Sequence, residues 1–552
     1  MVEDASRSPE ILKVLAIAEL DLLFKNGMII DGTGSPGFLG DVGVANGRIQ
    51  KMGKLWDAKA RRTIDIRGHM IAPGFVDMHT HSDLMLLAYP KAEAKTMQGV
   101  TTEVIGQDGL SFAPANREAM ESVRAMTAGW NGEHDSIEFD WSSVKEFLAK
   151  FDGHTSPNVA YCVPHGTVRL TVMGSENRRP TKEEMQEMRR LVRQGMKEGA
   201  VGLSTGMSYP PAMFADNDEL IQLCEETAQL GGYFSPHHRS YGKGVLESYA
   251  EMVEVCKKAR CPLHLTHCLV NFPGNEGKAV ELVKMLNSID RREVDLTVDS
   301  YCYLPGSTTL ASIVLPPWST TEGVAGMLAN LADDEKCRRM KHELEVEGIA
   351  GYHFVSMDWN TLEISSVPSK ENQRWIGKRV SEIAKELGIE PFQAARKLLL
   401  EEKLNVNVLL HIGHEDNVRT IMTQPYHTVG TDGIMTGQRP HPRAWGTFAR
   451  YLARYAREEH MFTWQEIIRH MSTTAYRRLG QFDRGLIRPG MAADLVVFDP
   501  NKVRDTATFD NPRQYPEGIP YVAVNGLLVK DEGFHTGALP GRVLKLEVAQ
   551  LA

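Results

Sequence analysis

Short apolar runs alternate with amphipathic helical patterns through the middle of the chain. The run at residues 159–166 precedes a segment at 181–200 whose apolar residues recur at helical spacing, and Thr181 and Glu184 form a capping-box pattern at its start. Repeated β-α units of this length predict a parallel sheet covered by helices, and about eight of them predict a barrel. A doubly wound open sheet is the alternative, but no Gly-x-Gly-x-x-Gly or phosphate loop follows the first strand.

The two ends of the chain have a different pattern, with short alternating runs joined by Asn-Gly dipeptides. These dipeptides favour the type I′ turns of β-hairpins, because both positions tolerate positive φ. They occur at Asn26-Gly27, Asn46-Gly47 and Asn525-Gly526. The shared pattern predicts that the two ends form one small domain with a single sheet.

This reading divides the chain into three parts. Residues 1–73 and 485–552 build the small β domain, and residues 74–484 build the (β/α)8 barrel. From about residue 304 to 407 the β-α alternation lapses into a long mixed segment. We expect this segment to be an insertion over the barrel mouth, a usual place for a lid.

Residue types that bind metals stand at the ends of the predicted barrel strands. His79 and His81 end the apolar run "GFVDMHTH", and side chains two apart on a strand point the same way. Further strands end in Asp108, His237, His267 and Asp432. Since the carboxyl ends of barrel strands face one mouth, these side chains would converge on a site for a divalent metal. Taken singly, each residue has an alternative role. Asp108 and Asp432 could each cap a turn, and His237 and His267 could be core residues with all their hydrogen bonds made within the protein.

Charge and cysteine usage narrow the class of partner. The 552 residues carry a net charge of −9 with both signs interspersed, which disfavours nucleic acid or an anionic membrane as the main partner and favours a small molecule. The seven cysteines form no CxxC pair or disulfide framework, so we expect a reducing, cytoplasmic location. The apolar run at 14–24 is interrupted by Glu19 and Asp21, which argues against a membrane span. The sequence leaves open whether the chain forms a homo-oligomer.

Several motifs, in a consistent order, resemble the amidohydrolase superfamily and, more closely, the N-acyl-D-amino-acid deacylases or D-aminoacylases. The broader resemblance rests on "IAPGFVDMHTHSD" and "GTDG", the closer one on "GLSTGMSYPP", "DSYCYLPGST", "HPRAWGTF" and "RPGMAADLVVFDP". It extends from about Phe24 to Leu544. It implies a distorted (β/α)8 TIM barrel with a small β-sandwich from both termini, and hydrolysis of a linear amide.

The resemblance also implies a ligand set for Zn²⁺, as one or two divalent ions. It assigns His79, His81 and Asp432 to an exposed position and His237 and His267 to a tightly held one. The family's remaining ligand is the cysteine of a "GNCG" motif, where this chain has "GQDG" and therefore Asp108. A carboxylate is a harder ligand than a thiolate and can bridge two ions, and other divalent metals would then suit the site.

The implied reaction is attack of metal-bound hydroxide on an amide carbonyl, with Asp432 as the proton shuttle. The resemblance places Tyr301 and Ser307 near the substrate's carbonyl and carboxylate. It pairs Arg443 with the α-carboxylate, and Arg239 also fits the family pattern. The family's second cationic group, a lysine after the sixth-strand histidine, is absent from "THCL" in this chain. A small-molecule amide, most simply an N-acyl-D-amino acid or a related N-acyl amine, is the expected substrate.

Two other functions compete with this one. A cyclic amide hydrolase of the hydantoinase or dihydroorotase kind would share the fold, but such relatives use a carbamylated lysine and no lysine ends the strand "VGLSTGM". A catalytically silent barrel that serves as a binding protein would typically have lost ligands, whereas this chain keeps a full set.

Overall fold

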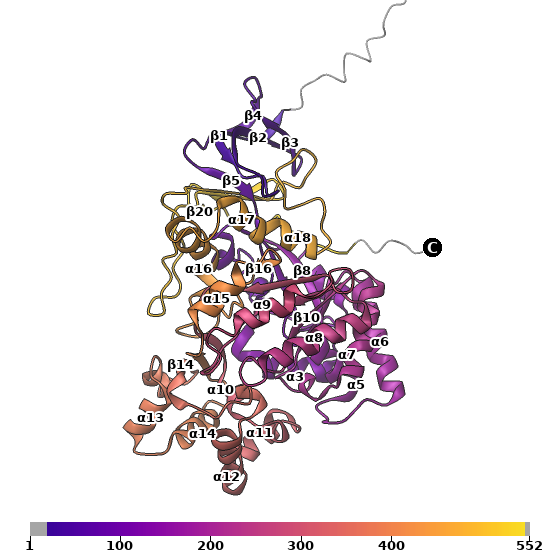
Figure 1. Ribbon diagram of the computed structural model, residues 1–552, viewed down its shortest axis with the longest axis vertical. Coiled ribbons are helices and arrows are strands. Elements are labelled where there is room, and N and C mark those ends of the chain that lie inside the picture. Colours follow the sequence, from indigo (N-terminus) through magenta and orange to yellow (C-terminus); the bar gives the residue numbers. More distant parts are fainter. Residues whose placement is uncertain (1–18, 547–552) are drawn as a thin grey trace, which may run out of the picture.

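A nearly closed barrel of eight parallel strands forms the centre of the molecule, for which a computed structural model describes residues 19–546 (Figure 1). Neighbouring strands follow the chain order around the barrel. They are β6 (Phe75–Asp77), β7 (Val100–Ile105), β8 (Asn158–Pro164), β9 (Gly202–Gly206), β10 (Tyr233–His237), β11 (Leu263–Leu265), β12 (Leu296–Ser300) and β16 (His427–Val429). The predicted (β/α)8 barrel is therefore confirmed.

Backbone hydrogen bonds connect the first and last strands of the barrel. The Met78 N–H donates to the Val429 carbonyl at 3.0 Å, and the Asp432 N–H donates to the His79 carbonyl at 2.7 Å. These bonds bring the segments that follow β6 and β16 side by side. Two of the predicted metal ligands, His79 and Asp432, therefore lie on adjacent stretches of backbone.

Helices cover the outside of the barrel, and the longer ones alternate with its strands. They are α1 (Met85–Ala88), α2 (Glu93–Thr96), α3 (Arg117–Asn131), α4 (Val144–Ala149), α5 (His165–Met173), α6 (Lys182–Lys197), α7 (Asn217–Gln229), α8 (Val245–Ala259), α9 (Ala279–Asn287), α15 (Glu415–Met422), α16 (Arg443–Arg450), α17 (Trp464–Ile468) and α18 (Thr474–Arg478). Helix α6 starts as the sequence predicted. The Thr181 hydroxyl accepts from the Glu184 N–H, and the Glu184 carboxylate accepts from the Thr181 N–H.

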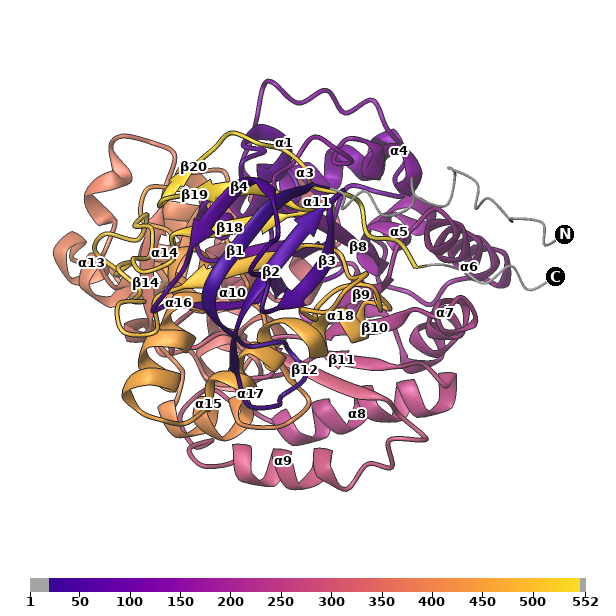
Figure 2. The same ribbon diagram turned by 90° about the horizontal axis from the view of Figure 1, so that it is seen from above.

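Both ends of the chain meet in one nine-stranded sheet outside the barrel (Figure 2). From the N-terminal side come β1 (Leu20–Ile29), β2 (Phe38–Ala45), β3 (Arg48–Gly53), β4 (Ala60–Asp65) and β5 (Met70–Pro73), and from the C-terminal side β17 (Leu495–Phe498), β18 (Tyr521–Val524), β19 (Leu527–Asp531) and β20 (Phe534–His535). Strand β5 pairs antiparallel with β17 and so joins the two halves. The exact domain boundaries, at 73/74 and 484/485, stay predictions.

The segment between β12 and β16 forms a small unit with its own hydrophobic core. It contains an antiparallel sheet in the order β13-β15-β14 and several helices. Their bounds are β13 (Gly306–Thr309), α10 (Leu310–Val314), α11 (Gly323–Ala332), α12 (Asp334–His342), β14 (Leu362–Ser366), α13 (Val380–Leu387), α14 (Pro391–Glu401) and β15 (Asn407–Leu410). In Figure 1 this unit lies at the opposite end of the molecule from β1 to β4. We call it the insertion.

Two further sequence-based expectations concern the chain's surroundings. Within residues 19–546, every helix is too short or too polar to span a lipid bilayer. Residues 14–18 of the early apolar run lie outside the described part of the chain. All seven cysteines are buried free thiols.

Candidate metal centre

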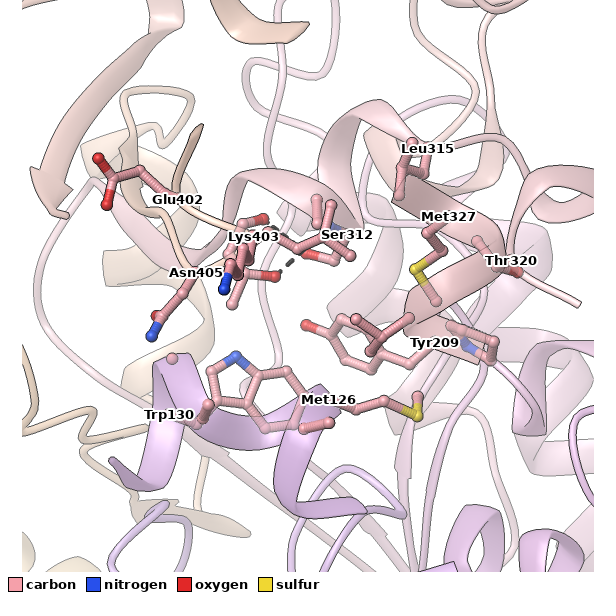
Figure 3. Close-up of a pocket in the computed structure, with 18 of the residues that line it drawn as sticks. Met126, Trp130, Tyr209, Ser312, Leu315, Thr320, Met327, Glu402, Lys403 and Asn405 are labelled. Carbon is pink, nitrogen blue, oxygen red and sulfur yellow. Dashed lines mark hydrogen bonds between the residues drawn. The ribbon is translucent and has the colours of Figure 1, made fainter. Parts of the chain in front are cut away.

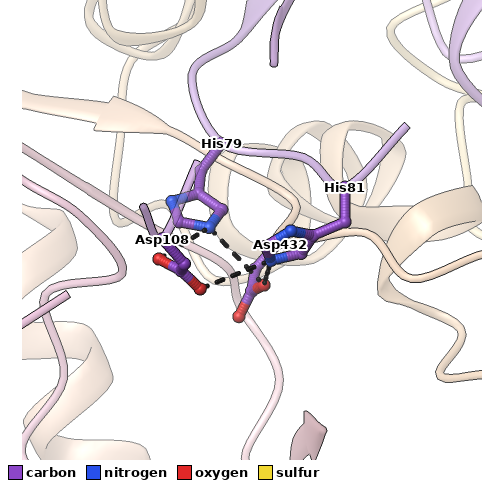
Figure 4. A group of neighbouring side chains, drawn as sticks. All are labelled: His79, His81, Asp108 and Asp432. Carbon is purple, nitrogen blue, oxygen red and sulfur yellow. Dashed lines mark ion pairs between the residues drawn. The ribbon is translucent and has the colours of Figure 1, made fainter. Parts of the chain in front are cut away.

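Two groups of side chains that suit a metal ion meet at the mouth of the barrel, and they share Asp108. One group is His79, His81, Asp108 and Asp432, drawn in Figure 4, and the other is Asp108, His237 and His267. Within each group the candidate ligand atoms all lie within 4.8 Å of one another. The structure thus brings together all six residues that the strand-end pattern selected.

Asp108 lies between the two groups and presents one carboxylate oxygen to each of two pairs of histidines. Its Oδ1 is 3.6 Å from His79 Nε2 and 3.3 Å from His267 Nε2. Its Oδ2 is 3.4 Å from His81 Nε2 and 3.7 Å from His237 Nδ1. A carboxylate that faces four imidazoles in this way suits a bridge between two cations better than a turn cap.

The backbone at three of these residues adopts the left-handed region that non-glycine residues rarely enter. The φ angles are +54° at Asp108, +30° at His267 and +49° at Asp432. Such conformations cost free energy and cluster at functional sites, where the surrounding structure holds them. Here they turn the side chains from the strand ends into the barrel mouth.

His79 provides a direct test of whether these residues fit a metal. Its ring is fully buried, and neither ring nitrogen has a hydrogen-bond partner within the described residues. A buried polar atom normally has a partner, and an unpartnered imidazole nitrogen 3.7 Å from Asp432 Oδ1 is well placed to bind a cation. The nitrogen and carboxylate donors of this centre fit one or two divalent ions.

The charges at the centre are consistent with such an ion. Burial lowers the pKa of His79 to about 4, which keeps its imidazole in the neutral form that binds metals. Burial acts against a charged His81 as well, but the carboxylates of Asp108 and Asp432 raise its pKa to about 9. Burial also opposes ionisation of Asp432, yet Arg443, 3.0 Å away, holds the pKa of that carboxyl below its usual range. Burial opposes ionisation of Asp108 too, but the neighbouring imidazoles hold the pKa of that carboxyl well below its usual range. Both carboxylates are therefore ionised, and a divalent cation bound between them would take the place of the proton on His81.

Three residues that sequence reasoning did not select orient the ligands. Ser208 hydrogen-bonds His237 Nε2 at 2.7 Å, which directs Nδ1 toward Asp108. Tyr241 hydrogen-bonds His267 Nδ1 at 2.9 Å, and Asp299 accepts from the His267 backbone N–H at 2.9 Å. Such contacts fix the tautomer and orientation of metal-binding histidines. Only Asp299 carries a sequence signal, since it ends the strand before "SYCY".

A cavity of about 80 Å³ opens above the ligands and contains two of the predicted substrate-binding residues, Tyr301 and Ser307. The insertion also contributes His353, whose Nδ1 is buried without a partner among the described residues. Nothing in the sequence pattern linked this histidine to the barrel mouth, because it is 79 positions from the nearest ligand, Asp432.

The two predicted substrate-binding arginines have other partners. Arg239 donates to the Glu251 carboxylate at 3.0 Å and to the Ala215 carbonyl at 2.8 Å, and it does not line the cavity. Arg443 is fully buried behind Asp432 and lies over the ring of Tyr301, 4.5 Å from its centroid. Glu251 therefore pairs with the first arginine and Asp432 with the second, and direct contact of either arginine with the substrate stays a prediction.

Comparison with known proteins agrees with this geometry. Residues 62–529 match a family model described as amidohydrolase family. D-aminoacylase of Alcaligenes xylosoxydans xylosoxydans is 31% identical over 525 residues, which cover 95% of this chain and 97% of the relative. N-acyl-D-glutamate deacylase of the same organism is 32% identical over 532 residues, covering 96% and 98%.

Solved structures show the same relationship. An N-acyl-D-glutamate deacylase from Bordetella bronchiseptica, complexed with zinc and a phosphonate that mimics the tetrahedral intermediate, matches with a TM-score of 0.80 at 30% identity, covering 96% of this chain and all of that one. A D-hydantoinase matches with a TM-score of 0.51 at 14% identity, covering 96% of this chain and all of that one, and shares the fold alone. The resemblance seen in the motifs is confirmed: the chain belongs to the amidohydrolase family and is a hydrolase of carbon–nitrogen bonds other than peptide bonds, similar to D-aminoacylase.

Proposed function

We propose that this chain is a metal-dependent deacylase of N-acyl-D-amino acids or related N-acyl amines. The observation that carries the proposal is the position of Asp108, whose two oxygens face four histidines at the barrel mouth, with Asp432 beside them. The curated relatives named for D-aminoacylase and N-acyl-D-glutamate deacylase activity support the D configuration. The solved zinc complex of a relative supports zinc as the ion.

The residues of the chain divide the work as follows. His79, His81, His237, His267, Asp108 and Asp432 would hold the ion or ions. When bound, a divalent ion activates water and polarises the scissile carbonyl. Asp432 lies at the cavity wall, so its carboxylate is placed to take a proton from the attacking water and deliver it to the leaving amine.

Arg443 has a distinct task in this proposal. By pairing with Asp432 Oδ2 at 3.0 Å it keeps that carboxylate ionised and fixes its orientation, while Asp432 Oδ1 faces His81 Nε2 at 3.2 Å. Tyr301 and Ser307 line the cavity and remain our candidates for contact with the substrate's carbonyl and carboxylate.

A cyclic amide hydrolase is the less supported alternative. No lysine lines the metal cavity within the described residues, so the carbamylated bridge of those relatives has no counterpart, and the similarity to hydantoinases extends to the fold alone. A silent binding protein is also disfavoured, because all six ligand side chains are present and converge.

A substrate panel on the metal-loaded protein tests the proposal. We expect release of free amine from N-acetyl-D-amino acids, loss of that activity after chelation and its recovery with Zn²⁺. The L enantiomers and hydantoins are the matched comparisons. Turnover of hydantoins with none of the linear amides would favour the cyclic alternative, and no turnover of any amide by protein with full metal content would favour the silent one.

A further inference from the structure

A second, larger cavity lies beside the metal cavity. Its volume is about 550 Å³, and it extends between α3 and the insertion. Most of its wall is apolar, with Met126 and Met213 from the barrel side and Leu315 and Met327 from the insertion (Figure 3). A cavity of this size and composition is typical of a small-molecule site.

Trp130 and Tyr209 stand at the junction of the two cavities, because both residues line both of them. The Trp130 ring packs on the ring of His81, with centroids 4.9 Å apart, and on Tyr209 at 5.0 Å. Tyr209 in turn packs on His237 at 4.8 Å. A molecule held at the metal centre therefore reaches the larger cavity by passing these two rings.

The indole N–H of Trp130 has no partner within the described residues. The side chain is 3% exposed, so water does not readily satisfy this donor. Tryptophan N–H groups usually find a partner when buried, and leaving one unpaired is costly. An unpaired donor that lines a cavity is thus available to a ligand in that cavity.

The surroundings of this N–H indicate what the ligand carries. In Figure 3 the indole nitrogen is turned toward the side of the cavity formed by Lys403 and Asn405. Both residues line the cavity, and neither side chain has a hydrogen bond or ion pair among residues 19–546. These three donors border one side of the cavity, although Lys403 is exposed to solvent and the carboxylates of Glu133, Glu401 and Glu402 also line the cavity. The buried indole donor therefore favours an oxygen acceptor, and the three glutamates favour a neutral carbonyl above a carboxylate.

We propose that Trp130 is a specificity residue that donates its indole N–H to an oxygen acceptor on the non-reacting, apolar arm of the substrate. The proposal rests on the deacylase function above and names the feature of the substrate that this chain selects. The arm enters the larger cavity past Trp130 and Tyr209 while the scissile amide stays at the metal centre. No bond is made or broken at Trp130, so its contact is equally strong before and during the reaction.

The test compares three N-acyl substrates whose arms have the same length and end in a carboxylate, a carboxamide or an alkyl group. The wild-type enzyme should prefer the carboxamide arm to the other two. Trp130→Phe keeps an aromatic ring but removes the donor, so kcat/KM should fall about tenfold more for the carboxamide substrate than for the alkyl one. The loss should lie in KM, because the contact is uniform along the reaction. Trp375→Phe is the matched control, since Trp375 is also buried with an unpaired N–H but lines neither cavity.

A binding measurement separates this inference from the proposed function. Phosphonate mimics with the same three arms should bind the zinc-loaded protein with the same preference for the carboxamide, and Trp130→Phe should abolish that preference even if no amide is hydrolysed. An equal effect of Trp130→Phe on all three arms, a fall in kcat alone, or an unchanged preference would overturn the assignment.

Discussion

Asp108 is the residue on which the proposed centre depends most, because histidines from three different strand ends face its two oxygens. The substitution Asp108→Asn keeps its shape and removes its charge. Removing a residue that only hydrogen-bonds a metal ligand lowers metal affinity by about 10- to 100-fold. Removing Asp108, a ligand itself, should therefore lower the affinity for Zn²⁺ by at least about 100-fold. Competition with a chromogenic chelator measures this change.

The matched variant Asp108→Cys should behave differently from Asp108→Asn. A thiolate is a softer ligand, so we expect it to keep zinc at the His237/His267 position and to weaken binding of harder ions such as Mn²⁺. If Asp108→Asn retained full metal content and full turnover, Asp108 would have no role as a ligand.

Asp432 is proposed both as a metal ligand and as the proton shuttle, and its substitution can separate proton transfer from metal binding. Asp432→Asn preserves the shape of the side chain but removes the proton acceptor, so kcat should fall by roughly 10²-fold or more. Steady-state kinetics at saturating metal measures the effect. Asp505→Asn is the control, since Asp505 also pairs with an arginine, Arg450 at 3.2 Å, but lies outside the metal cavity. Unchanged turnover in Asp432→Asn would assign the proton transfer to another group.

At the scale of elements, a buried ion pair connects the segments that carry the ligands. Lys95 of α2 contacts Asp77 of β6 at 2.5 Å, and both side chains are fully buried. The ammonium also donates to Thr80, between His79 and His81, and to Thr431, next to Asp432. Removing one partner of a buried ion pair leaves the other charge buried and uncompensated, which is strongly destabilising. Replacing both partners by apolar residues can leave the stability nearly unchanged.

We therefore expect Asp77→Asn to lower the free energy of unfolding by about 3–5 kcal/mol. The double substitution Asp77→Asn with Lys95→Met should cost less than the single one. Denaturant unfolding followed by tryptophan fluorescence checks both values, with Glu121→Gln in an exposed pair with Arg117 as the control. A double variant that is less stable than Asp77→Asn would show that the charge at Lys95 is not the cause.

A second element-scale prediction concerns pH and the barrel strand β7. Burial raises the pKa of Glu103 to about 7, although Lys95 and a hydrogen bond from Ser82 act in the opposite direction. A carboxyl whose pKa is raised in the folded state keeps its proton longer when folded. Its contribution to stability is therefore present at low pH and is lost as the pH rises from about 4.5 through 7.

The substitution Glu103→Gln removes that titration. Its stability relative to the wild-type protein should rise by roughly 2–3 kcal/mol between pH 5 and pH 8. Melting temperatures across this range measure the difference, and Glu118→Gln, at an exposed position, should follow the wild-type profile. A difference that does not change with pH would contradict the raised pKa.

At the scale of the whole molecule, the barrel and the ligand positions could be predicted because each depends on local pattern. Thr181 and Glu184 mark a helix start within four residues, and a histidine at the end of an apolar run marks a strand end whatever the rest of the fold. The contribution of the insertion could not be predicted. His353 of the insertion and Trp130 of α3 meet the same cavity only through tertiary packing of segments far apart in the chain. Likewise, Arg443 could not be placed behind Asp432 without the closure of the barrel.

The central claim is that Asp108 joins two groups of ligands into one metal centre, and X-ray diffraction at the zinc absorption edge of crystals of the zinc-loaded protein tests it most directly. We predict one or two anomalous peaks at the barrel mouth, each about 2.0–2.2 Å from histidine nitrogens and from a carboxylate oxygen of Asp108. With two peaks, both should contact Asp108, one beside His79, His81 and Asp432 and the other beside His237 and His267. Peaks elsewhere on the molecule, or an ion at the mouth that does not contact Asp108, would contradict the account.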